Sequence, residues 1–315
     1  MNVPSPFPSG AVTVREVGLR DGLQIIPRVM PTADKLAWLH GAYAAGLREI
    51  EVGSFVPPTR MPQLADTAEL VQAALALPGA KVSVLVPNLK GGLSALASGA
   101  HAMLFPVSAS EAHSLANLRK TPAQAVAEVA NIRAERDAAG SRCEIEVGIS
   151  TAFGCTIQGV VEPAAVVALV QAALMAGADT ISLADTVGYA DPRAVSELFA
   201  AVERVAPGRV VAAHFHDTRG LGVANVMAAF HAGIRRFDAC LGGIGGCPHA
   251  PGASGNVATE DVAYVMASMG VQTGLDLDAL FALREQLQGW LVDQPMYGHI
   301  AAAGLPKTMN TKEAA

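Results

Sequence analysis

The chain has few charged and few aromatic residues. Charged side chains make up 16% and aromatic side chains 5% of its 315 residues, whereas 51% are hydrophobic. A composition so rich in apolar residues and so poor in charge excludes an intrinsically disordered protein. With so few aromatic rings, the core must consist of Ala, Val, Leu and Ile, which is typical of buried parallel strands beneath Ala-rich helices.

Three kinds of segment are missing from the sequence. The 22 basic and 28 acidic side chains give a net charge of −6 and form no block of either sign, which excludes a polybasic surface for nucleic acid or membranes. The longest weakly polar stretch, residues 163–178, is too short to span a bilayer. Residues 1–8 have neither the basic start nor the apolar run of a signal peptide, so we expect a cytoplasmic protein.

Cysteines are also scarce. The four present, Cys143, Cys155, Cys240 and Cys247, include no pair spaced as C-x-x-C. This excludes a disulfide framework and gives no sign of a zinc or dithiol site. We expect the first three to be packing residues.

Short β-branched runs alternate with longer Ala- and Leu-rich stretches of helical spacing along the chain. The eight predicted strands cover residues 12–17, 49–53, 82–86, 101–106, 143–148, 180–184, 210–215 and 237–241. The predicted helices include residues 32–45, 63–77, 122–139, 163–176, 193–205, 222–232 and 277–292. Eight strand–helix units predict an α/β protein with a (β/α)8 TIM barrel fold, and a doubly wound open sheet is the competing fold.

No linker divides the sequence, so we expect residues 1–315 to form a single catalytic barrel domain. Residues 242–315 would then supply a Gly-rich active-site loop and a C-terminal extension of cap helices. The same helices offer a surface for a homodimer.

Polar residues follow several of the predicted strands. Because parallel strands of a barrel all end at one rim, these side chains are expected to meet there. They are Arg20, Asp21, Glu51, Ser54, Asn88, Asp185, Thr186, His214, His216 and Asn256.

The strongest local pattern is His214-Phe215-His216. Residues i and i+2 of a strand face the same side, so both imidazoles can point into the barrel mouth while Phe215 packs outward. With Asp21 and Asn256 at the same rim, they predict a divalent cation site. An N/O ligand set without thiolate favours Mg²⁺ or Mn²⁺.

Arg20 is suited to stabilising an oxygen that becomes an enolate, since its guanidinium does not lose its proton. Glu16 could pair with it instead, but four residues along an extended strand separate the two too far. Glu51 or Asp185 is the better partner. Each of these acids could equally form a structural salt bridge.

The segment Gly242-Gly243-Ile244-Gly245-Gly246-Cys247-Pro248 places a thiol in a glycine-rich loop. Glycines permit a loop to fold over a ligand. Unlike Cys143 and Cys240, Cys247 lies outside any predicted strand, so we expect it to act as a nucleophile or a proton donor. The Gly-x-Gly pattern that begins at Gly220 follows the two histidines and ends in Asn225, so it is not a dinucleotide fingerprint.

Several segments together resemble the 3-hydroxy-3-methylglutaryl-CoA lyase family of metal-dependent (β/α)8 barrels. They are residues 14–24 (VREVGLRDGLQ), 51–56 (EVGSFV), 87–91 (PNLKG), 182–186 (SLADT), 214–218 (HFHDT), 245–248 (GGCP) and 253–261 (ASGNVATED). The resemblance extends from about residue 12 to residue 292 and implies an acyl-CoA substrate, split into acetyl-CoA and acetoacetate.

The resemblance also implies residue roles. Asp21, His214, His216 and Asn256 would be the metal ligands, the last through water, and Asp21 or His214 would be the base. Arg20 would stabilise the enolate and Cys247 would protonate it. Glu51 and Asp185, with Glu16, Gln24, Ser54, Asn88 and Thr186, would position these groups or contact the substrate.

Two segments depart from the family pattern. Residues 25–27 (IIP) replace the usual Asn-Glu-Lys, and residues 156–159 (TIQG) replace Pro-Tyr-Glu-Gly. Both are less polar than the usual sequence and follow predicted strands. The alternatives are therefore a lyase for citramalyl-CoA or a longer-branched glutaryl-CoA, a Claisen-type condensing enzyme or aldolase, and a barrel retained only as a binding module.

Overall fold

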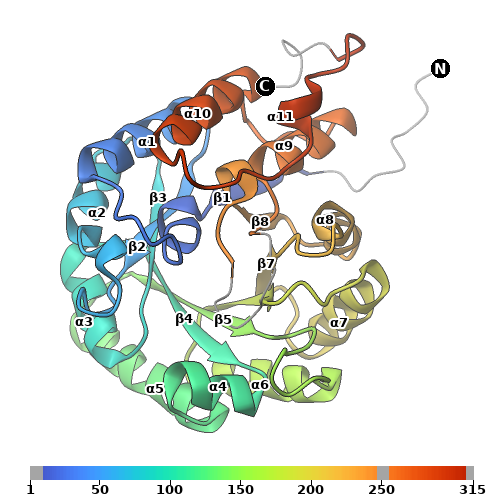
Figure 1. Cartoon of the computed structure of the whole chain (residues 1–315). Helices are drawn as coiled ribbons and strands as arrows, with labels where there is room; N and C mark the ends of the chain where they lie inside the picture. Colours follow the sequence, from blue (N-terminus) through green and yellow to red (C-terminus); the bar gives the residue numbers. More distant parts are fainter. Residues whose placement is uncertain (1–9, 247–254, 310–315) are drawn as a thin grey trace.

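The computed structural model describes residues 10–246 and 255–309. Its eight strands pair in chain order, all parallel, and close into a barrel between β1 and β8, so the predicted (β/α)8 fold is confirmed. Figure 1 shows the helices as an outer ring around these strands. The strands are β1 (Thr13–Glu16), β2 (Glu49–Ser54), β3 (Lys81–Leu85), β4 (Ala102–Ser108), β5 (Glu144–Ser150), β6 (Thr180–Asp185), β7 (Val210–Phe215) and β8 (Arg236–Ala239).

The predicted helices are present, within a few residues of their expected ends. The helices are α1 (Thr32–Ala44), α2 (Thr67–Leu75), α3 (Leu89–Ser98), α4 (Glu111–Leu118), α5 (Pro122–Ala138), α6 (Pro163–Met175), α7 (Pro192–Val205), α8 (Gly222–His231), α9 (Thr259–Ser268), α10 (Leu277–Trp290) and α11 (Ile300–Ala303). None of the helices in the described part of the chain combines the length and the apolar character needed to cross a membrane.

The extension after β8 packs on one side of the barrel. Helix α9 contacts α8, α10 contacts both α1 and α9, and α11 contacts α9. In Figure 1 α10 lies beside α1, and α9 and α11 lie on the other side of α10. Asp261 of α9 accepts hydrogen bonds from the backbone N–H groups of His299 and Ile300, which joins α11 to α9.

The aliphatic core lies between the strands and the helices, and the barrel interior is largely polar. Val14 of β1, Phe237 of β8 and Trp38 of α1 are at most 3% exposed and belong to the apolar cluster. By contrast, Arg15 of β1 bonds to Glu146 of β5, a strand that is not its neighbour, so the two side chains must meet inside the barrel. Successive side chains of a strand point to opposite faces of the sheet, so one set packs in the aliphatic core under the helices and the other set lies in the polar barrel interior.

Strand β1 ends earlier than the sequence predicts. After Glu16 the chain enters a π-helical turn, Gly18–Gly22, in which the backbone N–H groups of Arg20, Asp21 and Gly22 all point to the carbonyl of Val17. Such single turns are frequent at functional sites. The turn carries Arg20 and Asp21 over the barrel mouth.

Candidate active site

The π-helical turn can form because Gly18 lacks a side chain. A Cβ on Gly18 would overlap the ring of Trp38 and the carboxylate of Glu16. The turn therefore packs directly onto α1, and all five of its residues are buried. This packing fixes the position from which Arg20 and Asp21 project.

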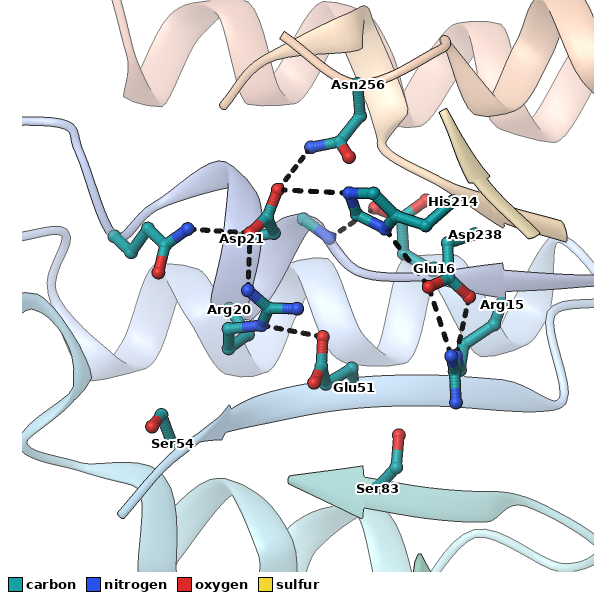
Figure 2. A network of polar contacts seen from close by, with 12 residues as sticks. Arg15, Glu16, Arg20, Asp21, Glu51, Ser54, Ser83, His214, Asp238 and Asn256 are labelled. Carbon is teal, nitrogen blue, oxygen red and sulfur yellow. Dashed lines mark hydrogen bonds and ion pairs between the residues drawn. The ribbon is translucent and has the colours of Figure 1, made fainter. Parts of the chain in front are cut away.

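Asp21 lies at the centre of the polar network in Figure 2. Its Oδ1 accepts hydrogen bonds from Arg20 and from Gln24 Nε2 at 2.6 Å, and its Oδ2 accepts one from Asn256 Nδ2 at 2.8 Å. Burial alone would raise the pKa of Asp21, but the charge of Arg20 and the nearby histidines outweigh it and hold that pKa well below its usual range. Asp21 is therefore an anion.

The two imidazoles predicted to share a face do so. His214 Nε2 lies 3.2 Å from His216 Nε2, and these nitrogens lie 3.8 Å and 3.7 Å from Asp21 Oδ2. Phe215 between them is fully buried and packs on the opposite side of the strand, as expected. Its ring centroid lies 6.1 Å from that of Phe153. Both histidines thus turn toward one carboxylate.

Asn256 reaches the site because the chain after the Gly-rich loop runs beside β7. The N–H of Asp217 donates to the carbonyl of Gly255 at 3.0 Å, and the N–H of Val257 donates to that of Phe215 at 3.0 Å. Asn256 thus forms an isolated bridge with His216. Residues more than 200 positions apart along the chain, Asp21 and Asn256, meet as predicted.

This arrangement fits a divalent cation. One ligand atom from each of Asp21, His214 and His216 lies within 4.8 Å of the others. Two imidazole nitrogens in contact cannot both carry a proton, so at least one lone pair points at the other ring. The Oδ1 of Asn256 is buried and has no hydrogen-bond partner in the described part of the chain. A carboxylate, two imidazoles and an amide oxygen together form an N/O ligand set for a divalent cation.

Arg20 pairs with Glu51, one of the two acids expected for it. Arg20 Nε donates to Glu51 Oε2 at 2.7 Å, and both side chains are at most 7% exposed. Burial would lower the pKa of Arg20, but the charges of Glu51 and Asp21 raise it, so the guanidinium keeps its charge. The alternative partner Glu16 accepts from Thr259 Oγ1, Leu241 N and Gly18 N instead.

Asp185 does not contact Arg20. Its carboxylate accepts from the backbone N–H groups of Tyr189 at 2.7 Å and Ala190 at 3.1 Å. It therefore shapes the loop after β6, because a carboxylate at a strand end readily caps the following turn. Thr186 has a similar role, since its Oγ1 accepts from the N–H of Thr151 after β5 at 2.8 Å.

Ser54 and Asn88 line a cavity of about 260 Å³ between the loops after β2 and β3. The Oγ of Ser54 is buried and has no partner in the described part of the chain. Asn88 caps α3 by accepting from Gly91 N at 3.0 Å. Lys90 also lines the cavity, so its wall offers a cation, hydroxyl and amide groups and apolar side chains to a ligand.

Cys247 lies outside the described residues. The other cysteines are free and buried, as expected for packing residues. Burial raises the pKa of the Cys143 thiol to about 12 and that of Cys240 well above its usual value. Neither thiol is therefore a ready source of thiolate.

Asp238 was not predicted from the sequence to belong to the site, but its Oδ2 lies 3.1 Å from His214 Nδ1. Nor were Arg15 and Glu146, although Arg15 bonds to both Asp238 and Glu146 across the barrel interior. A signal was present: a charged residue at every second position of a buried strand, as in Arg236-Phe237-Asp238, indicates a polar barrel interior.

Comparison with known proteins gives consistent matches. The family model described as HMGL-like matches residues 11–287. Hydroxymethylglutaryl-CoA lyase YngG of Bacillus subtilis is 36% identical over 283 residues, which cover 90% of this chain and 94% of that protein. The (R)-citramalyl-CoA lyase of Chloroflexus aurantiacus is 38% identical over 308 residues, covering 93% and 95%.

Two further relatives complete the comparison. The mitochondrial hydroxymethylglutaryl-CoA lyase of Arabidopsis thaliana is 40% identical over 272 residues, which span 86% of this chain but 58% of that protein. The structure of an HMG-CoA lyase from Acinetobacter baumannii, in complex with coenzyme A and 3-methylmalate, superposes with a TM-score of 0.88. It is 38% identical, and the match covers 98% of this chain and 99% of that one.

Proposed function

Because this chain belongs to the HMGL-like family of carbon–carbon lyases, we propose that it cleaves 3-hydroxy-3-methylglutaryl-CoA to acetyl-CoA and acetoacetate with Mg²⁺ or Mn²⁺. The observation that carries the proposal is the convergence of Asp21, His214 and His216 on one point of the barrel mouth. We further propose that the protein is a cytoplasmic homodimer.

Asp21, His214, His216 and Asn256 would hold the cation, which when bound makes the C3 hydroxyl of the substrate more acidic. Asp21 or His214 would take the proton of that hydroxyl, because both are buried beside the cation site.

Loss of that proton breaks the C2–C3 bond. The keto group of acetoacetate forms at C3, and the electron pair moves onto the thioester of the departing two-carbon unit as an enolate. Arg20 would stabilise this enolate, since its charge is fixed by Glu51 and Asp21 in a water-poor site. Cys247 would then donate a proton to C2 and release acetyl-CoA. The cavity lined by Ser54, Asn88 and Lys90, residues that follow β2 and β3, would hold part of the acyl-CoA.

A second candidate function is cleavage of (R)-citramalyl-CoA. The observation that favours it is the 38% identity to the Chloroflexus enzyme, which lies in the same range as the hydroxymethylglutaryl-CoA lyases. Ile25 and Ile157, in the two segments that depart from the family pattern, are 38% and 50% exposed. Citramalyl-CoA is one methylene shorter than hydroxymethylglutaryl-CoA and carries the same carboxylate and hydroxyl groups, so these apolar side chains favour instead a glutaryl-CoA with a longer apolar branch at C3.

The test is a turnover assay of the purified protein with Mn²⁺ on hydroxymethylglutaryl-CoA, citramalyl-CoA and a glutaryl-CoA with a longer branch at C3. The proposal predicts the largest kcat/KM for hydroxymethylglutaryl-CoA. A larger value for citramalyl-CoA would favour the second candidate. Absence of cleavage, together with release of CoA from acetyl-CoA and a 2-oxo acid, would instead indicate a condensing enzyme.

A further inference from the structure

A chain of four buried side chains connects the candidate metal site with the middle of the barrel. His214 Nδ1 lies 3.1 Å from Asp238 Oδ2. Arg15 donates to both oxygens of Asp238, from Nε at 2.7 Å and from Nη2 at 3.0 Å. The same guanidinium donates to both oxygens of Glu146 at 2.8 Å and 2.9 Å. Asp238, Arg15 and Glu146 are at most 3% exposed, and Figure 2 shows Arg15 below Asp238.

These contacts decide which ring nitrogen of His214 carries hydrogen. Asp238 receives two hydrogen bonds from Arg15, so it is an ionised carboxylate and can only accept. The nitrogen that faces it, Nδ1, must therefore donate. In a neutral imidazole the other nitrogen, Nε2, then has a free lone pair, and Nε2 is the atom that faces His216 and Asp21.

We propose that Asp238 is a positioning residue that fixes the tautomer and ring orientation of His214, and that the ion pairs of Arg15 with Asp238 and Glu146 hold it in place. This inference rests on the metal site of the proposed function, since Asp238 acts only through His214. Carboxylates that bind the remote nitrogen of a ligand histidine typically change metal affinity about 10–100-fold when they are replaced.

The arrangement also explains why charged residues occupy the interior of this barrel. Two bidentate contacts satisfy four of the five N–H donors of Arg15 without water. The planar guanidinium therefore sets the plane of the Asp238 carboxylate, and through it the plane of the His214 ring. A lysine at position 15 could not make both pairs, because an ammonium group lacks this fork.

The first test measures the tautomer directly in metal-free protein labelled with ¹⁵N-histidine. Two-dimensional ¹⁵N–¹H correlation spectra distinguish protonated from unprotonated ring nitrogens, and loss of a signal in His214→Gln assigns it. We expect a protonated Nδ1 and an unprotonated Nε2 for His214 in the wild-type protein. A protonated Nε2 with an unprotonated Nδ1 would overturn the proposal without the need for any Asp238 variant.

The second test is the affinity of Asp238→Asn for Mn²⁺, measured by isothermal titration calorimetry without substrate. We expect the affinity to fall about 10–100-fold. The matched control is Glu144→Gln, which removes another carboxylate of a barrel strand. Glu144 pairs with Lys81 at 2.7 Å and is not one of the four side chains that connect His214 with Glu146. It should bind Mn²⁺ as tightly as the wild type.

The outcomes separate the two proposals. Unchanged Mn²⁺ affinity and an unchanged His214 tautomer in folded Asp238→Asn would overturn the positioning role. Equal losses of Mn²⁺ affinity in Asp238→Asn and Glu144→Gln would show that both substitutions act through the stability of the barrel, and would also overturn the positioning role. Failure of the wild-type protein to bind Mn²⁺ would contradict the metal site itself, whereas the tautomer measurement would still test Asp238.

Discussion

Arg20 Nε donates to Glu51 Oε2 at 2.7 Å, and Arg20 Nη1 donates to Asp21. Its Nη2 makes no hydrogen bond to the residues that the structure describes, although the side chain is only 7% exposed. Two acids therefore fix the guanidinium while one of its amino groups stays available over the barrel mouth. This is the arrangement that an enolate oxygen requires, with a preorganised donor that keeps its proton.

We predict that Arg20→Met lowers kcat about 10²–10³-fold, because it removes a group that acts mainly on the developing enolate. KM should change much less than kcat. Steady-state kinetics with hydroxymethylglutaryl-CoA measures both. Arg193→Met, at a side chain that is 86% exposed, is the control and should have wild-type kinetics. A rise in KM of the same size with unchanged kcat would instead show that Arg20 binds the substrate as strongly as the transition state.

Replacement of a metal ligand should remove both metal binding and turnover. In His216→Gln we expect Mn²⁺ affinity to fall at least about 100-fold, since one of the imidazole ligands is lost. Calorimetry on metal-free protein provides the measurement. His40→Gln, at an exposed position of α1, should leave the affinity unchanged. Tight Mn²⁺ binding by His216→Gln would argue that the cation lies elsewhere.

Cys247→Ser should slow turnover without loss of Mn²⁺ affinity, because a serine hydroxyl is a much weaker acid than a thiol. We expect kcat to fall about 10²-fold or more. The control is Cys143→Ala, since Cys143 is buried and its thiol pKa is raised to about 12. Wild-type turnover in Cys247→Ser would exclude this thiol as the proton donor.

Glu16 gives the stability of the protein a pH dependence. Burial raises its pKa from 4.5 to about 7, against the hydrogen bonds from Thr259, Leu241 and Gly18 that favour the anion. The folded state thus holds this proton more tightly than the unfolded state. The resulting stabilisation is fully present below pH 4.5 and is lost as the pH rises through about 7.

We predict that this loss amounts to about 3 kcal/mol of the free energy of unfolding. Between pH 5 and pH 8, Glu16→Gln should therefore lose less stability than the wild type in denaturant titrations. Glu197→Gln, at an exposed residue of α7, should follow the wild-type curve. Parallel curves for Glu16→Gln and the wild type would show that the Glu16 pKa is not raised by folding.

Gly18→Ala should destabilise the fold by about 1–3 kcal/mol, because the added methyl group overlaps Trp38 and Glu16. The same change displaces the π-helical turn, so kcat should also fall. Thermal unfolding and kinetics measure the two effects. Gly289→Ala in α10, where a Cβ meets no atom within 4 Å, is the control for a helix-compatible substitution and should not lower stability.

The barrel and most of the site could be predicted because they depend on the periodicity of the apolar residues and on the order in which the strands are connected. Alternating strands and helices dictate a parallel barrel, and a barrel brings its strand ends to one rim, so Asp21, His214 and Asn256 were expected to meet. The π-helical turn could not be predicted, since it depends on the contact of Gly18 with Trp38. Asp238 was overlooked because barrel interiors are typically aliphatic, whereas this one holds ion pairs.

We propose above all that the cluster of Asp21, His214 and His216 binds a divalent cation that cleavage of hydroxymethylglutaryl-CoA requires. The most direct measurement is the rate of acetoacetate formation by protein stripped with a chelator, before and after Mn²⁺ or Mg²⁺ is restored. We predict negligible turnover in the stripped protein and recovery with either ion. Full turnover in rigorously metal-free protein, or no turnover with any divalent ion, would show that the reaction does not depend on a cation at this cluster.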